Sequence, residues 1–211
     1  MLPRTVPMPR LCPMLALAAA ALSMSACEAR TGPVGRSATV ASTPASASAV
    51  GPAEYAVLSA LLRAEVIDEE RSYLLISDST QKLEDFRGTH TPEAIATRLR
   101  LPVSVIHEYN RLNERHYPLR QAFALGSRTE MMSAAGLDSL NGERWQAFGR
   151  RHPGSAGVAL VSRVAFTPDG KTAVASYTVL CGGLCGTSAL VRLDLTDGEW
   201  KATAYAMQLV S

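Results

Sequence analysis

The sequence CGGLCG, at residues 181–186, lies between two apolar alternating runs, 173–180 and 187–195. Apolar residues at every second position are typical of half-buried strands, and glycine reaches the positive-φ conformations that a tight turn requires. The stretch therefore predicts an antiparallel hairpin with a disulfide between Cys181 and Cys185. In the chain-entropy model, a disulfide that closes a loop of about five residues adds roughly 2 kcal/mol to the free energy of unfolding. This helps to stabilise a small domain but is not enough to fold it alone.

Two other roles for Cys181 and Cys185 stay open. A redox pair normally has the spacing Cys-x-x-Cys, whereas three residues separate these two cysteines. A structural zinc site needs about four ligands, and the sequence holds no second cysteine pair. We therefore favour a structural disulfide over a redox pair, a metal site or free thiols, and we expect no metal and no cofactor.

Outward from the hairpin, the C-terminal part of the chain consists of four alternating runs: 158–166, 172–180, 187–195 and 199–207. Two turn sequences, TPDG at 167–170 and TDG at 196–198, lie between runs on either side of the hairpin. Consecutive strands joined by short turns form an antiparallel meander, in which each strand pairs with the next.

The part of the chain before these runs has helical periodicity, with predicted helices at 53–67, 92–99, 102–114 and 142–151. A short apolar run at 73–76 predicts a buried strand, and residues 123–125 and 128–132 are read as short extended pieces. Helices grouped before strands are typical of the α+β class. We therefore expect N-terminal helices packed on one face of a C-terminal four-stranded antiparallel meander, with one additional short strand.

Residues 1–26 are read as an export signal. Arg4 and Arg10 give it a basic start, residues 11–22 form an apolar run too short to span a bilayer comfortably, and small residues precede Cys27. The pattern resembles a bacterial lipoprotein signal. The resemblance implies that Cys27 becomes the mature N-terminus, with a diacylglyceryl thioether and an acyl chain such as palmitate on its amine. Several acyl chains suffice for stable anchoring.

Glu28 stands where aspartate would be the inner-membrane retention signal, so the same resemblance implies the outer membrane, facing the periplasm. The alternative is ordinary cleavage after Ala26, which would give a soluble periplasmic or secreted protein with an unmodified Cys27. Residues 27–52 are rich in Ala, Ser, Thr, Pro and Gly, and they can bury too little apolar surface to offset the entropy lost on ordering. They are read as the lipidated cysteine and a flexible tether. Residues 53–211 are read as a single α+β globular domain.

Composition agrees with one ordinary domain. A chain of 211 residues, 47% hydrophobic and 19% charged, has enough apolar material for one core. Loss of residues 1–26 would remove two arginines and no acid, so 21 basic against 19 acidic residues would become 19 against 19. The sequence has no basic stripe with interleaved aromatic residues, so we expect no nucleic-acid partner. The expected partners are membrane lipid, through the acyl chains, and an unknown envelope protein or ligand.

Several C-terminal motifs resemble those of a group of uncharacterised bacterial exported proteins and lipoproteins that share a Cys-Gly-x-Leu-Cys-Gly hairpin. The motifs are WxxF at 145–148, PxSxG at 153–157, SRVxF at 162–166, CGGLCG at 181–186 and GxWK at 198–201. The likeness covers about residues 143–203. It implies the compartment and the fold, and it implies no activity.

The sequence shows no clear catalytic constellation. The histidines form neither a His-x-x-x-His nor a His-Glu-x-x-His pattern: His90, His107, His116 and His152. His107 is read as a surface residue, and Ser162 and Arg163 as exposed strand residues. The sequence SDST at 77–80 is read as a polar turn whose side chains bond local backbone, rather than as a binding loop.

These observations favour a bacterial envelope lipoprotein whose domain serves binding or interaction, with no catalytic residue. The alternatives are a thiol-redox protein and a hydrolase-like envelope enzyme that uses Asp78, Glu84 or a histidine near Ser162 and Arg163. A cleft with two titratable groups within hydrogen-bond reach would favour the enzyme, and a flat apolar patch would favour the binding protein.

Overall fold

The computed structural model describes residues 49–67, 73–82, 90–140, 143–182 and 185–210. All of them belong to residues 44–211, one of the two units into which the chain divides. Cys27 and most of the predicted tether lie outside the described residues. The elements in chain order are α1 (Pro52–Glu65), β1 (Tyr73–Ser77), α2 (Pro92–Leu99), α3 (Val103–Leu112), β2 (Arg128–Met132), α4 (Ala134–Asp138), α5 (Glu143–Arg151), β3 (Ser155–Val161), β4 (Ala165–Phe166), β5 (Thr172–Gly182), β6 (Cys185–Thr196) and β7 (Glu199–Val210).

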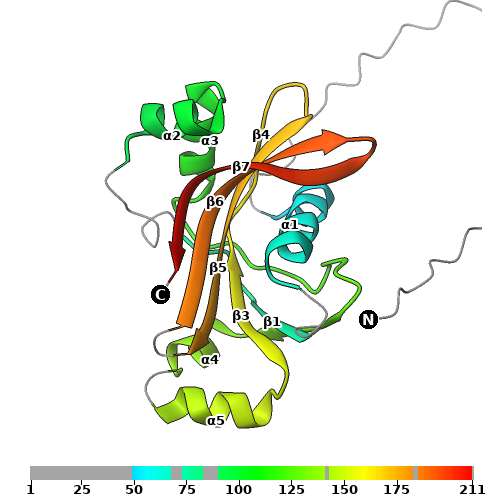
Figure 1. Ribbon diagram of the computed structural model, residues 1–211, viewed down its shortest axis with the longest axis vertical. Coiled ribbons are helices and arrows are strands. Elements are labelled where there is room, and N and C mark those ends of the chain that lie inside the picture. Colours follow the sequence, from blue (N-terminus) through cyan, green and yellow to red (C-terminus); the bar gives the residue numbers. More distant parts are fainter. Residues whose placement is uncertain (1–48, 68–72, 83–89, 141–142, 183–184, 211) are drawn as a thin grey trace, which may run out of the picture. The chain divides into compact units, whose positions relative to one another are not determined.

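In the described part of the chain, seven strands form one mixed sheet (Figure 1). The strand order is β2-β1-β3-β5-β6-β7, and β4 also pairs with β5. β1 runs parallel to β2 and to β3, whereas the pairs among β3 to β7 are antiparallel. The molecule is therefore α+β, but the prediction of a four-stranded antiparallel meander is wrong.

The error arises in the parallel part of the sheet. β1 has buried residues at all five positions, which is typical of a strand with neighbours on both sides and cover on both faces. Its neighbours β2 and β3 come much later in the chain, after connections that contain α2–α3 and α4–α5. Parallel neighbours require such long crossovers, so their pairing leaves no local pattern in the sequence.

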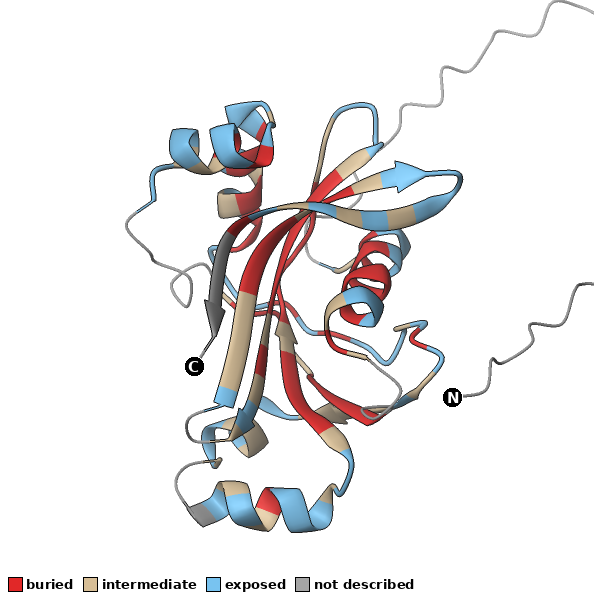
Figure 2. Cartoon of the chain, in the orientation of Figure 1, coloured by how far each residue is buried: buried red, intermediate tan, exposed pale blue. Residues whose placement is uncertain are grey.

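Helices cover both faces of the sheet, so the prediction of helices on one face is also wrong. α1 packs in a core cluster with Ala173 and Ala175 of β5, whereas α2 and α3 pack with Val174. Successive residues of a strand point to opposite faces, so α1 lies opposite α2 and α3. Figure 1 shows α2–α3 and α4–α5 at the two ends of that second face, and Figure 2 shows the buried strands between the layers.

A buried ion pair joins α1 to the break between β3 and β4. Arg163 donates from Nε and Nη2 to the two carboxylate oxygens of Glu54, at 2.7 and 3.0 Å, and the two side chains are 6% and 9% exposed. The backbone N–H of Val164 donates to Glu54, and that of Arg163 donates to Asn113, which follows α3. Ser162 is buried as well. The prediction that Ser162 and Arg163 are exposed is therefore wrong, because a charge partner from α1 draws this segment inward.

Candidate ligand site beside helix α5

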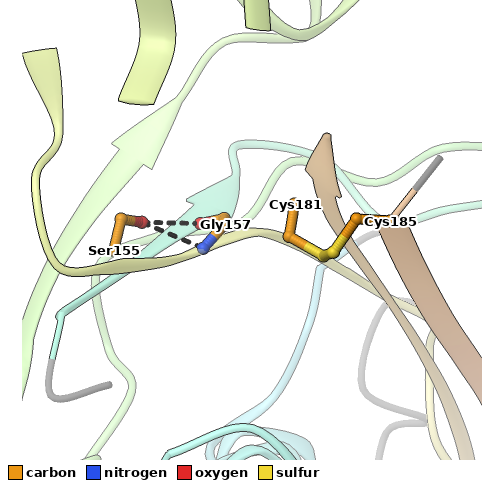
Figure 3. The surroundings of a disulfide bond; sticks show 4 residues. All are labelled: Ser155, Gly157, Cys181 and Cys185. Carbon is orange, nitrogen blue, oxygen red and sulfur yellow. Dashed lines mark hydrogen bonds between the residues drawn. A yellow bond between two sulfur atoms is a disulfide. The ribbon is translucent and has the colours of Figure 1, made fainter. Parts of the chain in front are cut away.

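Cys181 and Cys185 are joined by a disulfide across the tip of the β5–β6 hairpin, as the sequence predicts (Figure 3). Their Cα atoms lie 5.1 Å apart, an ordinary spacing for a disulfide, and both residues are exposed. Below the bridge, β5 and β6 pair regularly up to Leu180 and Gly186. The bridge therefore closes the hairpin at the end of the sheet where β3 begins.

Gly157 of β3 packs closely against this hairpin. Its backbone φ is +116°, and a Cβ at this position would overlap the carbonyl oxygen of Leu180 and lie 3.1 Å from the Cα of Cys181. The hydroxyl of Ser155 accepts a hydrogen bond from the N–H of Gly157 at 3.0 Å and donates to its carbonyl at 3.1 Å (Figure 3). The bridged hairpin and this local bonding together fix the start of β3.

The start of β3 in turn brings the end of α5 next to β1. Tyr73 pairs with Ser155 and Leu75 with Val158, so β3 holds one extra residue between the two pairs. A bulge of this kind bends a strand and redirects the residues beside it. The N–H of Ser155 donates to the carbonyl of His152 at 3.1 Å, which places His152 at the turn between α5 and β3.

Four polar side chains, which we call the Tyr73 network, connect the end of α5 with β1 and β2. The hydroxyl oxygen of Tyr73 lies 2.9 Å from Nδ1 of His152 and 2.7 Å from Oε2 of Glu130. Arg128 donates to the other oxygen of Glu130, and its guanidinium carbon lies 4.5 Å from the centroid of the Tyr73 ring. The ring centroid of Phe148 lies 4.8 Å from that of His152. His152 is therefore held from two sides.

The ionised state of Glu130 determines the proton positions in the network. Hydrogen bonds from Tyr73 and Arg128 lower the pKa of the Glu130 carboxyl, so at neutral pH it is a carboxylate that only accepts. Burial and the bond to Glu130 raise the pKa of Tyr73 to about 12, so Tyr73 keeps its single proton and donates it to Glu130. Nδ1 of His152 must then donate to Tyr73, which leaves Nε2 with the lone pair in the neutral ring.

A pocket of about 210 Å³, which we call the α5 pocket, lies beside the network between β2, α4 and α5. Its lining combines apolar and basic side chains: Met132, Leu140, Ala147 and Phe148, and Arg144, Arg151 and His152. None of the described residues of this lining carries a carboxylate. The pocket therefore offers a positive potential on one part of its wall and an apolar surface on another.

Two larger pockets, of about 500 and 420 Å³, lie along α1. They share Ala56 and Ser59. The larger is lined mainly by small side chains, and the other adds Val50, Pro52, Tyr55 and Arg120 to small ones. The charged groups of the larger pocket, Arg63 and Glu199, are opposite in sign, and Arg63 already donates to the carbonyl of Ala124. Ligand sites fix their ligand by a few convergent polar groups. We therefore take the α5 pocket as the candidate site.

The sequence offered Asp78, Glu84 or a histidine near Ser162 and Arg163 as a catalytic alternative. Among the described residues, the carboxylate of Asp78 accepts from the N–H of Ala134 at 3.2 Å, a bond that leads away from Ser162 and Arg163. Glu84 lies outside the described residues.

His107 is exposed, as predicted. The prediction for residues 77–80, a turn whose side chains bond local backbone, is only partly confirmed. The bond from the N–H of Ser79 to Ser77 is local, whereas Asp78 accepts from the distant N–H of Ala134 and the buried Thr80 accepts from that of Tyr117. Trp145 and Phe148 lie on one face of α5, with ring centroids 5.3 Å apart.

The Tyr73 network could not be read from the sequence, because its members come from β1, β2 and the end of α5. Those elements meet only through parallel pairing and the bulge at Gly157. The WxxF spacing in α5 was the available signal, since it identifies the helix face that packs toward His152.

Within the described ranges, no group of three or more His, Cys, Asp or Glu side chains could hold a metal ion. Among the same residues, no helix has the length and apolar character needed to cross a membrane. Comparison with family models, curated proteins and solved structures finds no match to this chain. The function is therefore inferred from the site and from the sequence.

Proposed function

We propose that this chain is a bacterial envelope lipoprotein whose α+β domain binds a ligand or partner without catalysing a reaction. Lipid on Cys27 anchors it in the outer membrane, facing the periplasm, and residues 27–52 tether the domain to that anchor. The signal-like residues 1–26 and the resemblance to exported proteins and lipoproteins support this placement.

The observation that carries the proposal is the disulfide between Cys181 and Cys185 at an exposed hairpin tip. Thiol systems of the cytosol keep such cysteines reduced, whereas exported proteins retain their disulfides. A bridge in this position therefore supports a domain that works outside the cytosol.

The α5 pocket supports binding rather than catalysis. The hydroxyl in its lining, that of Ser139, donates to the carbonyl of Gly136 at 2.6 Å, so its proton is not directed at a base. An envelope enzyme is the second candidate, because Tyr73 and Glu130 orient His152 as partners orient a general base. Binding is favoured because the described lining brings no nucleophile to His152.

Fractionation of bacteria that produce the full chain tests the anchor. We expect the native protein in the outer-membrane fraction, with incorporation of labelled palmitate. The variant Cys27→Ser should appear in the soluble envelope fraction without label, because it has no thiol to carry the diacylglyceryl group. Cys12→Ser removes a cysteine from the predicted signal and should behave like the native protein. Membrane association that persists in Cys27→Ser would contradict the lipid anchor.

A further inference from the structure

We propose that the α5 pocket binds a small organic carboxylate, with its acidic group against Arg144 and Arg151 and its apolar part against Leu140 and Phe148. This inference rests on the binding role proposed above and names the class of ligand. It does not depend on the lipid anchor, because every residue involved belongs to the folded domain.

Charge is the first reason for an anionic ligand. Arg144 and Arg151 are permanently cationic, and the described residues of the lining include no carboxylate that could neutralise them. Arg144 uses one N–H to donate to the carbonyl of Ser139 at 3.0 Å, which holds the side chain in place. The other N–H donors of its guanidinium are left for a ligand. Guanidinium groups bind carboxylates through paired N–H donors, so two of them at one pocket favour such a ligand.

The carboxylate of the Tyr73 network does not neutralise the arginines of the α5 pocket. Glu130 is outside the lining of the pocket, and its two oxygens are occupied by Tyr73 and Arg128. Its negative charge is thus balanced within the Tyr73 network, which leaves the arginines of α5 available to a ligand.

His152 adds a third polar contact of defined direction. Its Nδ1–H is directed to Tyr73, so Nε2 is the ring nitrogen left for a ligand, and no other hydrogen bond of this ring exists among the described residues. The ring also contacts Phe148, which limits its rotation. A ring that is held in this way can accept a hydrogen bond from a ligand hydroxyl without first losing its own freedom of movement.

Size and the apolar wall make the ligand organic. A volume of about 210 Å³ is below the roughly 300–1,000 Å³ of pockets for drug-sized molecules, which points to a compact ligand. Met132, Leu140, Ala147 and Phe148 supply an apolar wall that an inorganic anion would not use. A carboxylate with a short aliphatic or aromatic body uses both parts of the lining.

The arginines of α5 offer a matched comparison. Arg150 and Arg151 both lie in the last turn of α5, where a positive charge stabilises the helix end. Arg151 lines the pocket, whereas Arg150 does not. A role at the helix end would be shared by both residues, and a role in ligand binding belongs to Arg151 alone.

Calorimetry and NMR titration of the full chain with benzoate, acetate and inorganic phosphate test the proposal. We expect saturable benzoate binding that shifts amide signals of α5 and β2, and acetate should bind about tenfold more weakly because its only apolar group is one methyl. Arg144→Gln and Arg151→Gln should each weaken benzoate binding about tenfold. The melting temperature of Arg151→Gln should match that of Arg150→Gln, because each variant removes one charge from the same helix end. Arg150→Gln should change it less than about twofold.

Each contrary result overturns a stated part of the proposal. Absence of saturable benzoate binding, or an equal loss in Arg150→Gln, would remove the site. Inorganic phosphate that binds as tightly as benzoate would refute an organic ligand, because the apolar wall would then contribute nothing. Membrane fractionation is measured separately, so loss of the lipid anchor with intact benzoate binding would refute only the placement in the envelope.

Discussion

Gly157 is a single residue on which the position of the candidate site depends. Its φ of +116° is a backbone conformation that residues with a side chain rarely adopt, and the carbonyl of Leu180 fills the space that a Cβ would need. Ser155 is bonded to Gly157 on one side and to the carbonyl of His152 on the other. A shift of Gly157 would therefore also move His152.

We expect Gly157→Ala to lower the free energy of unfolding by more than about 2 kcal/mol, because backbone strain and a clash with Leu180 add together. Gly154→Ala is the control, since Gly154 also has a positive φ, +75°, but open space around it. It should lose only about 1 kcal/mol. Urea denaturation measures both variants, and equal losses would show that the close approach to Leu180 carries no energy.

Two glycines show what could and could not be predicted at this scale. Asp197 and Gly198 both have positive φ in the tight turn that the TDG sequence predicts, because that conformation depends on neighbouring residues alone. For Gly157 the sequence shows only a position in the PxSxG motif. Glycine is required there because the backbone of another strand lies against it, which no local pattern reveals.

The β5–β6 hairpin is the element that the sequence predicted most fully. Alternating runs, a glycine-containing tip and a pair of cysteines are all local signals, and the structure confirms the hairpin and its bridge. The run at 158–166 was predicted as one strand. The structure divides it into β3 and β4, because the pairing of Arg163 with Glu54 interrupts it. That partner lies in α1, so no pattern within the run could reveal it.

Removal of the bridge should destabilise the domain without unfolding it. We expect the double variant Cys181→Ser/Cys185→Ser to lose about 2 kcal/mol of unfolding free energy, from the loop-closure entropy of a short loop. Thermal denaturation of the native protein with and without a reductant serves as the control, because it breaks the same bond without a change of sequence. A melting temperature that is unchanged in both experiments would mean that the bridge contributes no stability.

At the scale of the whole molecule, one polar cluster links the layers on the two faces of the sheet. Glu54 comes from α1, Asn113 follows α3, and both bond the segment that contains Arg163. A buried charge that loses its partner is strongly destabilising, whereas exposed ion pairs contribute little. The cluster therefore ties the two helical layers to one point of the sheet.

We expect Arg163→Met to lower the free energy of unfolding by about 3–5 kcal/mol, because it leaves the Glu54 carboxylate buried without its cation. Glu54→Gln in the same chain should restore part of this loss. Arg111→Met removes an exposed partner of Glu108, 56% and 43% exposed, and should lose at most about 1 kcal/mol. Urea denaturation compares the three variants. A loss in Arg163→Met no larger than that in Arg111→Met would refute the structural role of the buried pair.

The parallel half of the sheet marks the limit of sequence-based prediction here. The α+β class follows from the order of helical and alternating segments, because each segment is recognisable by itself. The parallel pairing of β1 with β2 and β3, the cover on both faces and the Tyr73 network depend on contacts between segments far apart in the chain.

The central place of β1 also affects how the chain is made. Tyr73–Ser77 is synthesised long before either of its neighbours, Arg128–Met132 and Ser155–Val161. Until those segments leave the ribosome, the sequence YLLIS is an apolar strand with two unsatisfied edges, which is a site for aggregation. Slower translation between β1 and β3 would lengthen that exposure and lower the yield of folded protein, even though the finished sheet would be the same.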